Sequence, residues 1–238
     1  MRVSTTNFQN AFGKYLKLTM DSEDVIITKN GRAIAKLIEY EDPMVYVMKE
    51  GQGDYLIRRR VSYDEFVEIT NTSKARYELI DGEIYLMASP NHQHQVVISE
   101  LLVQLYEFFK EKACSPITSP FDVRLSNGAQ SFEDDPNVVQ PDLLVICDEE
   151  NINENGIYHG VPSLVIEVLS PSTRNKDMLT KLSLYMKSGV DEYWIVDLVN
   201  KQVYIYVFNE RSIKVMSTFK FASEIISEAF PGLSVVLN

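Results

Sequence analysis

Apolar residues along the chain alternate between helical spacing and short, nearly continuous apolar runs. Helical spacing predicts helices over Thr6–Leu18, Ser62–Ile69, His94–Lys112 and Met178–Ser188. The apolar runs predict strands over Phe121–Leu125, Val138–Ile146, Pro162–Ser170, Glu192–Asp197 and Gln202–Phe208. Asn-Gly and Asp-Gly turns predict hairpins over Asp24–Ile38 and Tyr77–Met87. This order predicts an α/β fold, in which two helices flank a mixed sheet of about five core strands.

The same pattern divides the chain into three parts. Residues 1–42 form a small α+β segment that is too short to bury a core alone, so we expect it to dock or to dimerise. Residues 43–60 are predicted to be a connector, with Gly51-Gln52-Gly53-Asp54 at its centre. The run Arg58-Arg59-Arg60 there either contacts phosphates or belongs to a solvated linker. Residues 61–238 form the larger domain.

Composition limits the classes of function. The 238 residues are 45% hydrophobic and carry a net charge of −11, which argues against binding nucleic acid over the whole surface. No apolar run reaches the roughly 18 residues of a membrane span, so no membrane partner is expected. Cys114 and Cys147 form neither a zinc pattern nor a disulfide framework. We expect both to be buried apolar groups in a protein of the reducing cytoplasm.

Two carboxylates lie within the most apolar strands. Asp142 is near the start of one predicted strand and Glu167 near the end of another. Burying a lone carboxylate costs several kcal/mol, so such a group usually has a cation or a proton as its partner. If the two strands are neighbours, both carboxylates can share one divalent metal ion, to which the carbonyl of Val168 could add a ligand. Lys181 follows on a predicted helix, and this set predicts metal-dependent phosphodiester cleavage.

Each of these residues also has a purely structural interpretation. The alternatives are a backbone cap for Asp142, an ion pair of Glu167 with Arg174 or Lys176, and an ordinary helical ion pair of Lys181 with Asp177. Lys176, expected on a loop, is the rival lysine for catalysis. The helix start after Ser170-Pro171-Ser172-Thr173 could hold an anion through its free N–H groups.

The N-terminal segment resembles the Phd/YefM antitoxin family. The resemblance rests on Val3-Ser4 before the helix, on the run Val25–Gly31, and on Ala33-Ile34-Ala35. It implies a segment that dimerises and contacts operator DNA, with a toxin as a possible further partner. A helix and hairpin that serve only for dimerisation would show the same pattern.

Residues 60–238 resemble the PD-(D/E)XK nuclease superfamily, and more closely its Uma-type family of bacterial restriction endonucleases. Asp142 within Pro141-Asp142 and Glu167 within Glu167-Val168-Leu169 match the acids of the motif. Leu169 occupies the usual lysine position, and the Uma-type pattern instead carries a lysine on the next helix, here Lys181. The resemblance implies a restriction-endonuclease-like fold, with Asp142 and Glu167 as ligands of Mg²⁺ (Mn²⁺ as a substitute) and Lys181 assisting the attacking water.

The Uma-type pattern also includes Glu78, within Tyr77–Glu83, ahead of Ser89-Pro90 and a histidine at His92 or His94. Glu78 either completes the acidic cluster or is a surface charge of the hairpin. His94 either contacts phosphate or is simply exposed at a helix start.

The function expected from these patterns is a Mg²⁺-dependent DNA endonuclease that acts as a homodimer. Two alternatives remain: a DNA-binding, antitoxin-like regulator, and a catalytically inactive interaction protein with a nuclease fold.

Overall fold

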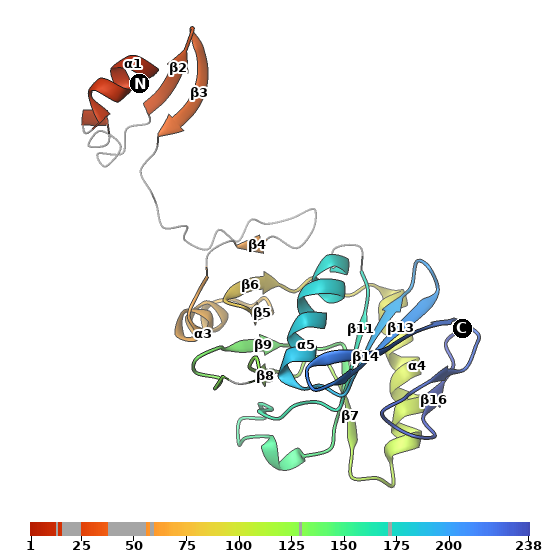
Figure 1. Cartoon of the computed structure of the whole chain (residues 1–238). Helices are drawn as coiled ribbons and strands as arrows, with labels where there is room; N and C mark the ends of the chain where they lie inside the picture. Colours follow the sequence, from red (N-terminus) through yellow and green to blue (C-terminus); the bar gives the residue numbers. More distant parts are fainter. Residues whose placement is uncertain (13, 16–24, 38–55, 58–59, 129, 171–172) are drawn as a thin grey trace. The chain divides into compact units, whose positions relative to one another are not determined.

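The computed structural model describes residues 1–12, 14–15, 25–37, 56–57, 60–128, 130–170 and 173–238. The chain separates into two compact units, Met1–Met48 and Lys49–Asn238, which are described one at a time (Figure 1). Most of the predicted connector 43–60, including Arg58 and Arg59, lies outside the described residues, and so do Pro171 and Ser172.

The N-terminal unit contains one small sheet. Strand β2 (Val25–Lys29) pairs parallel with β1 (Arg2–Ser4) and antiparallel with β3 (Arg32–Leu37). Helix α1 (Thr5–Asn10) begins where the Ser4 hydroxyl accepts the N–H of Asn7 at 3.2 Å. The β2–β3 hairpin confirms the predicted Asn-Gly turn. Part of the helix predicted over Thr6–Leu18 lies outside the described residues.

The larger unit is built around a six-stranded sheet with the order β14-β13-β12-β11-β10-β7. Its strands are β7 (Ser115–Thr118), β10 (Leu143–Ile146), β11 (Leu164–Val168), β12 (Glu192–Asp197), β13 (Gln202–Asn209) and β14 (Ser212–Lys220). The β11–β12 pair is parallel and the other pairs are antiparallel, so the predicted mixed sheet is confirmed. β7 and β14 were not predicted.

A second sheet of five strands has the order β4-β6-β5-β9-β8, and all its pairs are antiparallel. Its strands are β4 (Leu56–Ile57), β5 (Tyr77–Ile80), β6 (Glu83–Leu86), β8 (Val123–Leu125) and β9 (Asn137–Val139). Asp81 and Gly82 turn β5 into β6 with φ of 51° and 77°, as the Asp-Gly pair predicts. A short pair, β15 (Ile225–Ile226) and β16 (Ser234–Val235), lies near the C-terminus.

The helices of this unit are α3 (Tyr63–Thr72), α4 (His92–Phe109), the 3-10 turn η1 (Glu149–Asn151), the π-helical turn η2 (Lys176–Lys181) and α5 (Leu182–Ser188). Helices α4 and α5 pack on opposite faces of the six-stranded sheet, whereas α3 packs on the second sheet. Alternate strand residues point to opposite faces. Leu143 and Trp194 therefore pack with α4, whereas Leu144 and Tyr193 pack with α5. No helix within the described ranges is both long and apolar enough to cross a bilayer.

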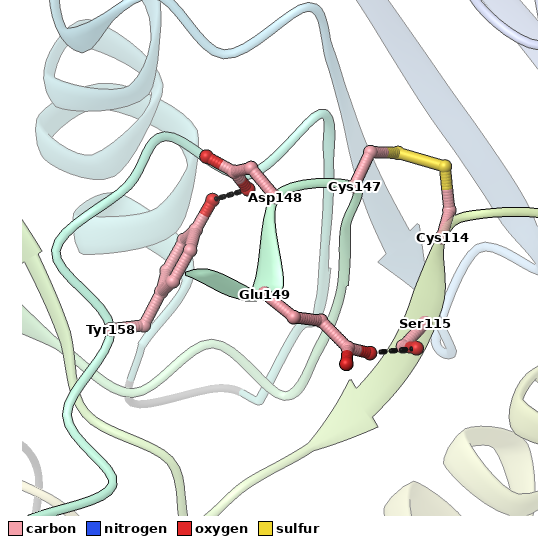
Figure 2. The surroundings of a disulfide bond; sticks show 6 residues. All are labelled: Cys114, Ser115, Cys147, Asp148, Glu149 and Tyr158. Carbon is pink, nitrogen blue, oxygen red and sulfur yellow. Dashed lines mark hydrogen bonds between the residues drawn. A yellow bond between two sulfur atoms is a disulfide. The ribbon is translucent and has the colours of Figure 1, made fainter. Parts of the chain in front are cut away.

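The two cysteines form a disulfide bond, so the prediction of free, buried thiols is wrong (Figure 2). β7 and β10 are antiparallel with Ser115 opposite Ile146, and the next pair in this register is Cys114 opposite Cys147. Their Cα atoms are 4.0 Å apart. Cys147 is exposed and Cys114 half-buried. The pairing depends on strand register, which cannot be read from the spacing of two cysteines.

Candidate active site

The register of two core strands brings the predicted carboxylates together. Asp142 directly precedes β10, and Glu167 is in β11. These strands are antiparallel with Leu143 opposite Ile166, so the next pair in the register is Asp142 opposite Glu167. The backbone N–H of Val168 also donates to Oδ2 of Asp142 at 2.8 Å. Asp142 therefore does cap a backbone group, in addition to facing the same pocket as Glu167.

Lys181 reaches the carboxylates from the helical side. Its Nζ donates to Oε1 of Glu167 at 2.7 Å and lies 2.7 Å from Oε1 of Glu78. The helical partner Asp177 is farther away, at 4.0 Å. Lys181 is buried, so it bridges two buried carboxylates rather than forming only a surface ion pair. The interpretation of Lys181 as an ordinary helical ion pair is incomplete.

A π-helical turn explains why two lysines point into this cluster. In an α-helix, residues five apart differ by about 140° in direction. The wider π turn of η2 places Lys176 and Lys181 on the same side, since its hydrogen bonds join residues five apart. Lys176 is buried, and its Nζ donates to Oε2 of Glu78 at 3.0 Å. The prediction of Lys176 on a loop is therefore wrong.

Glu78 lies beneath the pocket and is fully buried, so its interpretation as a surface charge is wrong. It is in β5 of the second sheet, and its Oε1 accepts the N–H of Gln140 at 3.0 Å. Burial alone would raise the pKa of Glu78, but Lys181 and Lys176 together hold it at about 2. Glu78 therefore carries a full negative charge, and it anchors both lysines.

Carboxyl groups outnumber ammonium groups in this cluster. The four carboxylates of Glu78, Asp142, Glu167 and Asp177 face the two ammonium groups of Lys176 and Lys181. Burial raises the pKa of Glu167 to about 8 despite the opposing charge of Lys181, and the neighbouring carboxylates add to the rise. Burial likewise raises the pKa of Asp177 to about 6. A cation would stabilise the ionised form of these buried carboxyl groups.

His94, at the start of α4, contacts the carboxylate of Asp142. Asn91 caps α4 by accepting the N–H of His94 at 2.9 Å. This places Nε2 of His94 3.1 Å from Oδ2 of Asp142. Burial alone would lower the pKa of His94, but the hydrogen bond and charge of Asp142 raise it. His94 is buried, so the expectation of an exposed helix-start histidine is wrong.

These side chains open into a cavity of about 140 Å³. Asp142, Glu167, Lys181 and His94 line it, together with the loop from Met87 to Asn91. A larger cavity of about 600 Å³ lies between the start of α3 and the loop 133–136, and none of the predicted site residues lines it. The smaller cavity is the candidate active site, because it alone of the two contains the predicted chemistry.

The donor set fits Mg²⁺ but not an all-protein metal cage. Among the described residues, no three His, Cys, Asp or Glu side chains are gathered closely enough to hold a metal ion. Mg²⁺ usually keeps several waters and needs only one or two carboxylates. Asp142 and Glu167 supply these, and both hydrogen bonds to Glu167 arrive at Oε1. Oε2 of Glu167 is thus the oxygen that could bind the ion.

Residues 63–238 match the Uma2 family, which is described as "Putative restriction endonuclease". The chain belongs to the Uma2 family. A protein of Synechocystis sp. (strain ATCC 27184 / PCC 6803 / Kazusa), slr1290, is 25% identical over 152 residues, which are 63% of this chain and 76% of that protein. A solved structure from Anabaena variabilis ATCC 29413, described as a putative nuclease belonging to DUF820, has a TM-score of 0.59. It is 19% identical and covers 74% of this chain and 94% of its own, which confirms the predicted fold class.

The Uma2 match begins after the N-terminal unit, so the antitoxin-like character of residues 1–42 stays a prediction. Within the Uma2 region, sequence reasoning missed the role of Tyr185. Its hydroxyl donates to Oε1 of Glu167 at 2.9 Å. The signal was present, because Tyr185 follows Lys181 by four residues and so shares its helix face. The burial of Lys176 had no such signal, since a π turn is not visible in apolar spacing.

Proposed function

We propose that this Uma2 protein is a Mg²⁺-dependent endonuclease that hydrolyses phosphodiester bonds of DNA, with Mn²⁺ as a substitute ion. One observation carries the proposal: Asp142 and Glu167 lie opposite each other across two core strands, and Lys181 donates to Glu167 in the same cavity. The family description points in the same direction. The surplus of buried carboxylates supports a divalent cation as the missing charge.

Each side chain has a defined task in this proposal. A bound Mg²⁺ supplies charge neutralisation at the phosphate and acidifies a water molecule. Asp142 and Glu167 hold the ion, while His94 and the N–H of Val168 fix the orientation of Asp142. Lys181 orients the attacking water and offsets the negative charge that develops at phosphorus. Glu78 fixes the position of the Lys181 ammonium group through an ion pair.

The expected assembly is a homodimer. Two copies would bring two active sites to the two strands of a duplex, as restriction-type cutting requires. The N-terminal unit would supply dimer contacts and a separate attachment to DNA, as its resemblance to Phd/YefM antitoxins implies. Such an attachment would also compensate for the net charge of −11, which repels DNA from the rest of the surface. The expectation of a reducing cytoplasm rests on free thiols, and the Cys114–Cys147 disulfide removes that argument.

Cleavage of supercoiled plasmid with Mg²⁺, Mn²⁺ or EDTA tests the proposal. Wild type should nick or linearise the plasmid only with a divalent ion, and Asp142→Asn and Glu167→Gln should each reduce cutting at least about 100-fold. Glu111→Gln is the control, because it removes the same charge from an exposed position at the end of α4. If cutting survives in EDTA, or persists in Asp142→Asn at the rate of the control, the proposal is wrong.

A DNA-binding regulator, or an inactive protein with a nuclease fold, remains the second candidate. The observation in its favour is that Lys181 already contacts two carboxylates, which reduces its ability to act on a substrate. A variant that lacks residues 1–42 separates the two. A nuclease should still nick DNA with a divalent ion, more slowly because the proposed dimer contacts and DNA attachment are gone. A regulator should show no metal-dependent cutting and should lose its affinity for DNA.

A further inference from the structure

A second cavity adjoins the candidate active site. It measures about 150 Å³, and Asp142 and Pro90 line both cavities. The rest of its polar lining comes from three elements: Arg76, Gln95, Ser99, Thr118 and Ser119. This volume is below the roughly 300–1,000 Å³ of typical small-molecule pockets, so the cavity suits a small group on a larger ligand.

Arg76 is fixed in this second cavity by a chain of two hydrogen bonds. Its Nη1 donates to Oγ of Ser119 at 3.0 Å. The backbone N–H of Ser119 in turn donates to the carbonyl oxygen of Asp142 at 3.2 Å. Hydrogen bonds through Ser119 therefore link the guanidinium group to the backbone of Asp142, the first acid of the active site.

The charge of Arg76 has no carboxylate partner among the residues that the structure describes. Arg174, in contrast, pairs with Asp197 at 2.7 Å. Arg76 is half-buried, and only one of its five N–H donors is used by a described residue. A guanidinium that no carboxylate of the described residues pairs is notable in a chain whose net charge is −11.

We propose that this second cavity binds a phosphate of the DNA backbone next to the scissile one, with Arg76 as its main donor. The inference rests on the proposed function, since the active site defines which phosphate is the neighbour. A guanidinium fork matches two phosphate oxygens in geometry and in charge. The hydroxyl and amide groups of Ser99, Thr118 and Gln95 are the side-chain types that contact phosphate and sugar rather than reading bases. Arg76 thus positions the strand and does not specify its sequence.

The salt dependence of DNA binding tests this role directly. Fluorescence anisotropy with a labelled duplex of random sequence, with Ca²⁺ in place of Mg²⁺, gives the affinity at several salt concentrations. Arg76→Gln should weaken binding about tenfold and lower the slope of log K against log salt by about 1. Arg76→Lys should keep the slope, because the charge remains, while losing part of the affinity because the fork is gone.

The matched control is Lys214→Gln. It removes the same single charge from an exposed position on β14, at the opposite end of the six-stranded sheet from β7. It should leave both affinity and slope unchanged. Ser99→Asp is an independent second variant: it places a negative charge in the cavity without touching the Arg76–Ser119 bond, and it should weaken binding at least as much as Arg76→Gln. In plasmid cleavage, Arg76→Gln should raise KM and leave the rate at saturation nearly unchanged.

The outcomes separate this inference from the proposed function. If wild type cuts DNA and Arg76→Gln matches Lys214→Gln in slope, the phosphate site is wrong and the nuclease stands. If wild type binds without cutting and Arg76→Gln lowers the slope, the second cavity still binds a backbone phosphate, but the nuclease is wrong and with it the neighbouring scissile phosphate. A wild type that neither binds nor cuts overturns both. Should Arg76→Gln fail to fold, as judged by Trp194 fluorescence, Ser99→Asp alone decides: unchanged binding in that variant overturns the site.

Discussion

Removing the charge of Lys181 should destabilise the protein even where no substrate is present. Lys181→Met keeps most of the side-chain volume but deletes an ammonium group that lies 2.7 Å from both Glu78 and Glu167. The carboxylates of these two partners are almost completely buried, at 0% and 4% exposure. At pH 9, where Glu167 with its pKa of about 8 is ionised, breaking this buried ion pair from one side should cost about 3–5 kcal/mol, because it leaves an uncompensated buried charge. We expect a loss of that size in the free energy of unfolding.

A double-mutant cycle tests the reasoning behind this magnitude. Glu167→Gln removes the carboxylate whose pKa is raised to about 8 and keeps an acceptor for the hydroxyl of Tyr185. Combined with Lys181→Met, it should reduce the loss to about 1–2 kcal/mol, since Glu78 still has Lys176 at 3.0 Å. Glu167→Gln alone should cost little, because Lys181 keeps Glu78 at 2.7 Å, so the coupling free energy of the two sites should be about 2–3 kcal/mol.

Urea unfolding in EDTA at the same alkaline pH, followed by fluorescence, measures these differences. Trp194 is the only tryptophan of the chain and is fully buried in the core of the larger unit, so its emission reports that unit alone. The midpoint of Lys181→Met should fall by about 1–2 M urea. Strict additivity of the two substitutions, or a loss below about 1 kcal/mol in Lys181→Met, would refute the bridging role. The cycle also shows whether lost cutting in a Lys181 variant reflects chemistry or folding.

Three further predictions concern parts of the larger unit outside the cavity. Arg174 and nearby amides hold the pKa of Asp197 below its ordinary 3.8 despite burial. The ionised carboxylate therefore stabilises the fold above about pH 4, and this stabilisation decreases as the pH falls. The difference in urea midpoint between wild type and Asp197→Asn should shrink on acidification. Glu192 accepts hydrogen bonds from two backbone N–H groups of the segment 227–229, and Glu192→Ala should cost about 2–4 kcal/mol and speed hydrogen exchange of those amides. Reducing the Cys114–Cys147 bond, which spans 33 residues, with dithiothreitol should lower the free energy of unfolding by about 3–4 kcal/mol. In the Cys114→Ala, Cys147→Ala protein, dithiothreitol should not change the urea midpoint.

Local signals explain which parts of the fold could be predicted. The Asp-Gly hairpin and the helix that starts at Ser62 need only neighbouring residues, and both occur as predicted; Ser62 and Glu65 form a capping box at the start of that helix. The strands with Asp142 and Glu167 were recognisable because buried strands are almost entirely apolar. Their pairing followed from one assumption, that two such strands are neighbours. The register that places the two acids opposite each other supports it.

Long-range features could not be predicted in the same way. Glu78 is on a hairpin that looks solvent-facing by its charge, and only the meeting of β5 with the helix of Lys181 makes it fully buried. The disulfide depends on the register of β7, a strand that carries a proline and was missed. β14 was missed because most of its residues are exposed and its apolar pattern is weak. Each of these depends on partners distant in sequence.

The π turn η2 also has a consequence for how this part of the chain tolerates insertions and deletions. A π turn holds one more residue than the α-helical turn it replaces. Deleting one residue between Asp177 and Lys181 would let an unbroken α-helix replace the π turn, and the two lysines would then be four residues apart, still on one helix face. Both lysines should therefore keep facing the carboxylates after such a deletion. The π turn is thus a position at which the chain can lose one residue without losing either lysine.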